Sequence, residues 1–227
     1  MVDFTGGTWR SLIDGSEVSA IPDSVGTQYD AADVSGTIQT WPDSVGDRDI
    51  TGGDPEVLAD ELNGEPVVSF DTDDLLSLDS SEWPDIEPPF TVIAVVADSL
   101  QGSDSYAVFG EQDGDDNNVR IVWRNDSWTI SIEGDDIDGS DTDLPVILTG
   151  IWSENGGLWE NGDRTVDTDT ADTMESIEMN SIRDGSIWNN ELEIAKLNIY
   201  PDDNLHETGD RADEEQRLAD RFGISLE

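Results

Sequence analysis

Two segments of the chain carry apolar side chains on both faces of an extended strand, and this pattern restricts the fold most strongly. One segment runs from Phe90 to Ala97, and the other ends at Tyr200. Successive side chains of a strand point to opposite faces, so apolar residues on both faces are typical of the interior of a sheet. We therefore predict two interior strands. In the second, alternation predicts two opposite sets: Ala195, Leu197 and Ile199 against Lys196, Asn198 and Tyr200.

Further short strands, separated by turn residues, are predicted along the chain. The segments 119–124 and 128–133 flank an Asn125-Asp126 turn and predict a hairpin. We expect residues 134–143 to form an acidic loop. Many short strands at this spacing predict an all-β sandwich of one domain. The hairpin is expected to direct six side chains inward: Val119, Ile121, Trp123, Trp128, Ile130 and Ile132.

The segment 210–222 has the pattern of a short C-terminal helix. Asp210 is suited to cap its first turn, and Asp213 and Arg217 have the i,i+4 spacing of an ion pair. Gly223 is suited to the position after the last turn. We therefore expect this helix to close the sandwich.

Acidic residues dominate the charged side chains. The chain has 54 Asp and Glu against 10 Lys and Arg, which gives a formal net charge of −44. Such a charge ordinarily favours disorder, but eight tryptophans and clear strand patterns indicate a folded protein with an acidic surface. Concentrated salt screens the repulsion between acids, so we predict a halophilic source; an acidic mesophilic protein is the alternative. Nucleic acid is excluded as a partner, because no basic stripe is present to neutralise phosphates.

Three features that the sequence lacks exclude further kinds of site and location. The chain has no cysteine, which excludes disulfides and thiolate metal sites. No apolar run approaches the ~20 residues of a membrane span, so we predict no membrane insertion. The first residues lack the basic and apolar regions of a signal peptide, and we expect no export by that route.

Residues 1–27 differ in pattern from the rest of the chain. We predict an N-terminal arm over residues 1–27 and a sandwich domain over residues 28–227. The sequence Ile21-Pro22 indicates an extended segment followed by a turn. We expect the arm to pack on the sandwich or to dock onto another subunit, and a loose tail is the alternative.

Four stretches carry a resemblance to a known superfamily: 29–33 with 41–43, 63–71 with 73–74, 90–97, and 190–200 followed by a helix ending at 221–224. On these stretches the chain resembles the concanavalin A-like lectin/glucanase superfamily, in particular its laminin-G-like members, over roughly residues 28–227. The resemblance implies a jelly-roll sandwich of two antiparallel sheets. It also implies binding of carbohydrate or protein, with calcium in some members. The arm, with residues 21–24 included, is similar to the segment that leads into the domain in haloarchaeal virus proteins.

Catalytic residues are not indicated. Glycosidases of this superfamily carry a Glu-x-Asp-x-x-Glu strand, and the nearest stretches here, 175–178 and 191–193, do not reproduce it. The single histidine, His206, has no Ser/Asp pattern around it, so a catalytic triad is not expected and a solvated surface position is. We predict that the protein is not an enzyme.

Two arginines and two tryptophans are candidates for ligand binding. Arg120 and Arg124 share one face of the 119–124 strand and are suited to charge-assisted contacts with acidic sugars. Trp159 and Trp188 lie near turns, where an indole ring can stack on a sugar ring. The alternative is that the arginines pair with neighbouring acids such as Glu133 and that the tryptophans belong to the core.

Two acidic loops are candidates for oxygen-ligand metal sites, because carboxylates suit Ca²⁺ and Mg²⁺. Neither has EF-hand spacing, and a solvated acidic surface is the alternative. We predict no essential cofactor and leave a Ca²⁺ or Mg²⁺ ion open. The denser loop holds Asp113, Asp115 and Asp116, and the second holds Asp71, Asp73 and Asp74.

Together these features predict a non-enzymatic virion surface protein of a halophilic archaeal virus, as a turret, spike, fibre or capsid decoration. We expect it to be assembled in the host cytoplasm, to form a homo-oligomer, to bind other virion proteins through its arm and to contribute to attachment to host-surface glycans. The alternatives are a purely structural capsid-cementing protein and a secreted module that binds or hydrolyses glycans.

Overall fold

The structure is a computed structural model. The residues that it describes are 2–5, 8–11, 17–18, 25–71, 74–78, 83, 85–100, 105–110, 119–124, 127–132, 135–168, 173–174, 177–179 and 191–227.

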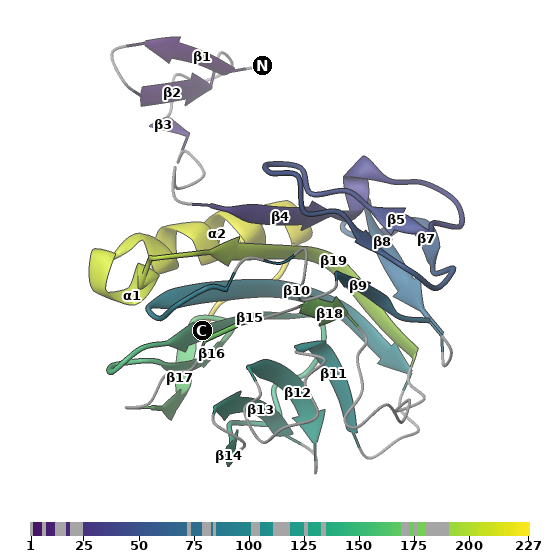
Figure 1. Ribbon diagram of the computed structural model, residues 1–227. Helices are drawn as coiled ribbons and strands as arrows, with labels where there is room; N and C mark the ends of the chain where they lie inside the picture. Colours follow the sequence, from purple (N-terminus) through teal and green to yellow (C-terminus); the bar gives the residue numbers. More distant parts are fainter. Residues whose placement is uncertain are drawn as a thin grey trace.

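Two antiparallel sheets, each of eight strands within the described residues, form a sandwich (Figure 1). The helix-side sheet has the order β17 (Asp163–Asp167), β16 (Gly157–Glu160), β15 (Val146–Trp152), β10 (Phe90–Leu100), β19 (Glu191–Tyr200), β8 (Glu65–Phe70) and β7 (Glu56–Leu62), and β4 (Thr27–Asp30) also pairs with β19. The outer sheet has the order β14 (Asp135–Asp138), β13 (Ser127–Ile132), β12 (Arg120–Arg124), β11 (Ser105–Gly110), β18 (Ile177–Met179), β9 (Leu76–Leu78), β6 (Ile50–Thr51) and β5 (Thr40–Trp41). The prediction of an all-β sandwich is confirmed.

The main core fills the space between the two sheets. Phe90 and Trp152 stack there with ring centroids 5.0 Å apart. The alternation predicted for the hairpin is confirmed, because five of its six inward side chains belong to this core and Trp123 packs against it. The opposite face of the hairpin is therefore turned away from the core.

A second core explains why two strands are apolar on both faces. Helix α2 (Asp210–Phe222) covers the face of the helix-side sheet that is turned away from the outer sheet (Figure 1). Leu218 and Phe222 of the helix form a buried cluster with Ile93 and Val95 of β10 and with Tyr200 of β19. Strands β10 and β19 are thus covered on both faces, as predicted.

A β-bulge changes the predicted alternation of β19. Leu197 and Ile199 face the main core, but Ala195 lies in the second core. The register explains the difference, because Val95 pairs with Lys196 while the next residue, Val96, pairs with Ile194. The skipped residue, Ala195, therefore points to the opposite face. The prediction that it shares a face with Leu197 and Ile199 is wrong.

The C-terminal helices follow β19 directly. The short α1 (Leu205–Thr208) precedes α2, and both the bounds of α2 and the position of Gly223 agree with the prediction. Gly209 precedes the first helical residue, Asp210, so Asp210 is not the N-cap. None of the described helices is long and apolar enough to cross a membrane.

Buried ion pairs join α2 to the sheet beneath it. Lys196, the only lysine of the chain, lies 2.7 Å from Asp30 of β4 and is 2% exposed. Arg221 donates to both oxygens of Asp30, at 2.6 and 3.0 Å, and also pairs with Glu65. Asp30 additionally accepts the backbone N–H of the 3₁₀ helix η1 (Ala31–Asp33). One carboxylate therefore holds β4, β19 and α2 together.

A second group of polar side chains crosses the same interface. Glu214 of α2 is 2% exposed and accepts hydrogen bonds from Asn198 and Tyr200 of β19, at 3.0 and 2.9 Å. Arg217 also belongs to this group, because it forms an i,i+3 ion pair with Glu214 in place of the predicted pair with Asp213. The polar residues on this face of β19 thus find their partners on the helix.

Three short strands near the N-terminus form a separate sheet: β1 (Val2–Thr5), β2 (Thr8–Ser11) and β3 (Glu17–Val18). Figure 1 shows this sheet standing apart from the sandwich, beyond the end of β4. Strand β4 begins at Thr27 and pairs with β19, so it belongs to the helix-side sheet of the sandwich.

Candidate functional site

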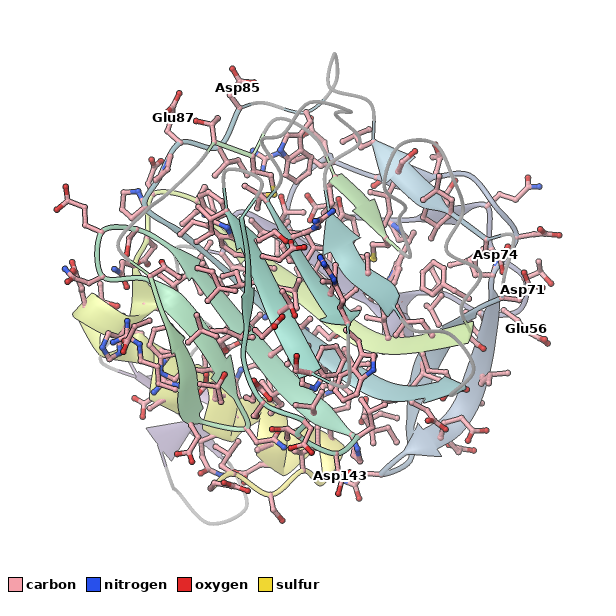
Figure 2. The ribbon with its side chains drawn as sticks, turned by 90° about the horizontal axis from the view of Figure 1, so that it is seen from below. Glu56, Asp71, Asp74, Asp85, Glu87 and Asp143 are labelled. Atoms are coloured by element: carbon pink, nitrogen blue, oxygen red, sulfur yellow. The ribbon has the colours of Figure 1, made fainter. Side chains whose placement is uncertain are left out.

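The candidate site lies on the face of strands β12, β13 and β14 that is turned away from the core, called here the outer face. Because Ile121, Trp128 and Ile130 point into the core, the residues between them point outward. Figure 2 looks onto this side of the molecule, with the strands of the outer sheet in front. The outward side chains of the three strands are Arg120, Val122, Arg124, Ser127, Thr129, Ser131, Asp136 and Asp138.

Asp136 lies between the two predicted arginines. Its Oδ1 is 2.8 Å from Nη2 of Arg120, and its Oδ2 forms an ion pair with Arg124. The Oγ of Ser131 accepts from Nε of Arg120 at 2.8 Å and donates to Asp136. We call Arg120, Arg124, Ser131 and Asp136 the Arg–Asp cluster.

The side chains of the Arg–Asp cluster differ in their exposure to solvent. The side chains of Arg120 and Asp136 are 10% and 14% exposed, whereas that of Arg124 is 34% exposed. Beside them, the hydroxyl of the buried Thr129 donates to Asp138 at 3.0 Å. Arg120 thus holds Asp136 in position, and Arg124 presents its guanidinium to solvent.

Acidic side chains surround this face. Figure 2 shows the labelled carboxylates near the outline of the molecule and not over the middle of the strands. Five of them are exposed: Glu56, Asp71, Asp85, Glu87 and Asp143. The sixth, Asp74, is buried and accepts the backbone N–H groups of Asp54 and Asp71, so it joins its own loop to the segment that holds Asp54.

The cluster combines groups that suit a hydroxyl-rich ligand. A guanidinium offers several fixed N–H donors, a carboxylate offers only acceptors, and a serine hydroxyl offers both. Hydrogen bonds that involve a charged group are shorter and stronger than neutral ones. A polar ligand at this place can therefore accept hydrogen bonds from Arg124 and donate hydrogen bonds to Asp136.

Asp136 was not predicted from the sequence. The segment 134–143 was predicted to be a loop, but residues 135–138 form the edge strand β14, which pairs with β13. The signal is the alternation Asp136-Ile137-Asp138, in which Ile137 packs against the core. Pairing of the arginines with a nearby acid, the alternative to ligand binding, is observed, although the acid is Asp136; Glu133 lies outside the described residues.

Trp159 lies in β16 of the helix-side sheet and not on the outer face. It is 2% exposed, and the guanidinium carbons of Arg164 and Arg211 lie 4.8 and 5.0 Å from its ring centroid. The exposed His206 packs against it at 5.0 Å between ring centroids. Its ring is thus already covered by cationic and aromatic side chains. The other predicted tryptophan, Trp188, lies outside the described residues.

The predicted metal ligands are not described either. Asp113, Asp115 and Asp116 all fall outside the described residues, as does Asp73 of the second loop. In the part of the chain that the structure describes, no group of three or more His, Cys, Asp or Glu side chains is arranged to hold a metal ion. A metal ion at the predicted loops stays a prediction.

Comparison with known proteins shows that the fold is similar to domains of proteins that were solved in complex with carbohydrates. By sequence, the chain matches no protein-family model and no curated protein. By structure, it is similar to Trypanosoma rangeli sialidase in complex with sialic acid, with a TM-score of 0.62 and 10% identity over 94% of this chain and 35% of the sialidase chain. This chain therefore spans about a third of the length of that sialidase.

Two further solved structures share the fold. Domain 4 of AbnA, a GH43 extracellular arabinanase from Geobacillus stearothermophilus, in complex with arabinotriose, matches with a TM-score of 0.56 and 13% identity, over 78% of this chain and 92% of that domain. A structure concerned with ganglioside-dependent cell entry of botulinum neurotoxin type C matches with a TM-score of 0.52 and 13% identity, over 86% of this chain and 52% of that chain.

These likenesses establish a lectin-like β-sandwich fold, in agreement with the jelly-roll expected from the resemblance. They also correct one prediction. Proteins that contain this fold include a sialidase and an arabinanase. The prediction that the protein is not an enzyme is therefore contradicted, because the fold is one that glycosidases contain.

Proposed function

We propose that the sandwich is a glycan-binding domain and that it binds carbohydrate on the outer face, at the Arg–Asp cluster. The observation that carries the proposal is the position of Arg124, which is partly exposed beside the less exposed Asp136. This arrangement places a charged donor next to a charged acceptor, as the hydroxyl pairs of a sugar ring require.

The structural neighbours support the carbohydrate class. The arabinanase domain, which this chain covers over 92% of its length, was solved in complex with arabinotriose, and the neurotoxin structure concerns an interaction with gangliosides. The charge of this chain adds a preference. With a net charge of −44, its surface repels anionic ligands over about one Debye length, so neutral glycans are favoured until concentrated salt screens that repulsion.

We expect the Arg124→Ala variant to lose glycan affinity by about tenfold or more, because a hydrogen bond to a charged group contributes about 1.5–3 kcal/mol. Ligands would be found on an array of neutral and acidic oligosaccharides in 3 M NaCl, and affinities measured by isothermal titration calorimetry. The same samples would be assayed for released sugar, which tests hydrolysis directly.

Arg164→Ala is the matched control for this experiment. Its side chain is 31% exposed, close to the 34% of Arg124, and it also forms a surface ion pair, with Asp167. Arg164 covers Trp159, so loss of affinity in this variant alone would move the site to that tryptophan and contradict the outer face. Binding that both variants retain, or no binding by the parent protein, would contradict the proposal as well.

A finer proposal concerns where the domain works. We infer that it belongs to the surface of a virion of a halophilic archaeal virus, with the arm as its attachment. The support is the acidic composition, with a single lysine, and the separate β1–β3 sheet. A sheet of three very short strands buries little apolar surface, so a docking partner would stabilise it. A capsid-cementing role is the alternative.

The arm proposal predicts a change of mass. In about 3 M NaCl, light scattering is expected to show an oligomer for the full chain and a folded monomer for a chain lacking residues 1–24, which retains all of β4. Circular dichroism would verify that the shortened chain is folded. Equal masses for the two proteins would contradict self-association through the arm.

A further inference from the structure

The loop of residues 42–49 packs along the edge of β4 through hydrogen bonds to one residue. Ser44 donates its backbone N–H to the carbonyl of Gln28 at 2.8 Å, and Gln28 donates its N–H to Oδ1 of Asp43 at 2.9 Å. The loop is closed by a second acid, since Asp43 donates its N–H to Oδ1 of Asp49 at 2.9 Å. Asp43 therefore sits where the loop meets the sheet, 7% exposed.

The two oxygens of Asp43 have different surroundings. Oδ1 accepts two backbone N–H groups, from Gln28 at 2.9 Å and from Val45 at 3.1 Å. Oδ2 is buried and has no hydrogen-bond partner, which is true of no other carboxylate among the described residues. Burying a charged oxygen without a partner is costly, so this oxygen calls for a positively charged or hydrogen-bonding ligand.

A second oxygen, the backbone carbonyl oxygen of Gly26, also lies close to Gly46. A Cβ atom built on Gly46 would lie 2.6 Å from Oδ2 of Asp43 and 3.3 Å from the carbonyl oxygen of Gly26. Both oxygens therefore lie close to residue 46, where only a glycine leaves space beside Oδ2. A carboxylate oxygen and a backbone carbonyl oxygen are the ligand types that hard cations select.

The neighbouring charged groups do not neutralise this position. The guanidinium of Arg48 is directed elsewhere: it donates to Oγ1 of Thr27 at 2.6 Å and lies 5.5 Å from the ring centroid of Trp83. Tyr29, from β4, donates its hydroxyl to the carbonyl of Arg48. Burial raises the pKa of Tyr29, the charge of Asp43 raises it further, and the charge of Arg48 lowers it. Within the loop, the three acids Asp43, Asp47 and Asp49 outnumber the one base, Arg48.

We propose that the 42–49 loop binds a hard metal cation, Ca²⁺ or Na⁺, through Oδ2 of Asp43 and the carbonyl oxygen of Gly26. The cation neutralises the buried oxygen and links the loop to the start of β4. This site is separate from the Arg–Asp cluster and from the acidic loops that the sequence indicated, and it does not depend on the glycan proposal. Water coordinates a cation bound in this way wherever the protein supplies no oxygen.

The test compares Asp43→Asn with Asp47→Asn in the full chain. Both variants remove one negative charge from the same loop, but Asp47 is exposed. In Asp43→Asn, the amide carbonyl can keep both N–H donors of Oδ1, and the amide nitrogen can donate to Gly26. The variant is therefore expected to fold without the cation, which circular dichroism would verify.

Thermal midpoints would be measured at constant ionic strength in tetramethylammonium chloride, whose bulky cation does not fit the site. CaCl₂ would be added in one series and NaCl exchanged in the other, which distinguishes the two ions. At a hundredfold excess over the dissociation constant, we expect a saturable rise of about 5 °C or more for the parent protein and Asp47→Asn. Asp43→Asn is expected to show no such rise.

A second variant covers the case in which Asp43→Asn fails to fold. In Gly46→Ala the new methyl group would occupy the space next to Oδ2, so the rise of the thermal midpoint with the cation is expected to disappear. Residue 46 lies in an exposed part of the loop, so the chain is expected to fold. Equal responses of the parent protein and the folded variants to Ca²⁺ and Na⁺ would overturn the site. Midpoints of the parent protein that depend only on ionic strength would overturn it too.

Discussion

Replacing Asp30 with alanine is expected to lower the free energy of unfolding by about 3–5 kcal/mol, the usual cost of removing one partner from a buried ion pair. Asp30 is 6% exposed and accepts from both Lys196 and Arg221. Arg221 keeps Glu65 as a partner in the variant, but Lys196 loses the one acid that an ion pair joins to it within the described structure. The lysine must then remain buried unpaired or give up its proton.

The pH dependence gives this prediction a second measurement. Burial alone raises the pKa of Asp30, but the hydrogen bonds from Arg221 and the charge of Lys196 outweigh burial and lower that pKa to about 2. An unfolded aspartate has a pKa of about 3.9. The stabilisation by Asp30 is therefore fully present above about pH 4 and is lost as the pH falls toward 2.

Urea unfolding in about 3 M NaCl, followed by tryptophan fluorescence from pH 7 to pH 2, would measure both effects. Asp33→Ala is the control, because Asp33 lies in the 3₁₀ helix that Asp30 caps but is exposed. We expect that control to change stability by no more than about 0.5 kcal/mol. An Asp30→Ala variant as stable as the control would show that the ion pair contributes nothing to folding.

Raising NaCl from about 0.1 M to 3 M is expected to raise the thermal midpoint by about 10 °C or more, because salt screens the repulsion among the acids. The chain carries 54 acidic and 10 basic side chains, and several of the basic ones are already paired within the sandwich. The folded protein therefore brings many unpaired negative charges together on its surface.

The shape of the salt curve separates screening from other salt effects. The Debye length falls from about 10 Å at 0.1 M to about 3 Å at 1 M, so screening acts mostly below 1 M. Exclusion of salt from apolar surface continues at higher concentration. A variant with five exposed acids replaced by their amides (Glu56, Asp71, Asp85, Glu87 and Asp143) is expected to melt higher than the parent at low salt and to match it at 3 M. A midpoint independent of salt would contradict the acidic-shell interpretation.

Regular elements were predictable because local pattern and tertiary packing agree in them. Strand Glu191–Tyr200 ends at the predicted residue, and helix Asp210–Phe222 has the predicted bounds. The alternation of the hairpin also identified which face carries Arg120 and Arg124. In these segments, the side chains that alternate in the sequence are the ones that the core buries.

The features that escaped prediction depend on partners that are distant in sequence. Ala195 changes face because β10 imposes a bulge on β19, and β19 alone carries no sign of it. Asp136 becomes part of a cluster only because β14 pairs with β13. Asp43 is held against the sheet because its Oδ1 accepts from Gln28 of β4, which lies 15 residues away in the chain. In each case an irregular or edge position takes its role from a neighbouring strand.

The burial of Lys196 determines how the protein reacts with amine-directed reagents. Its ammonium group is the only side-chain amine in the sequence, and it is closed in beneath α2. Activated esters will therefore reach this amine only when α2 separates from the sheet, so the rate of coupling to Lys196 measures how often that interface opens.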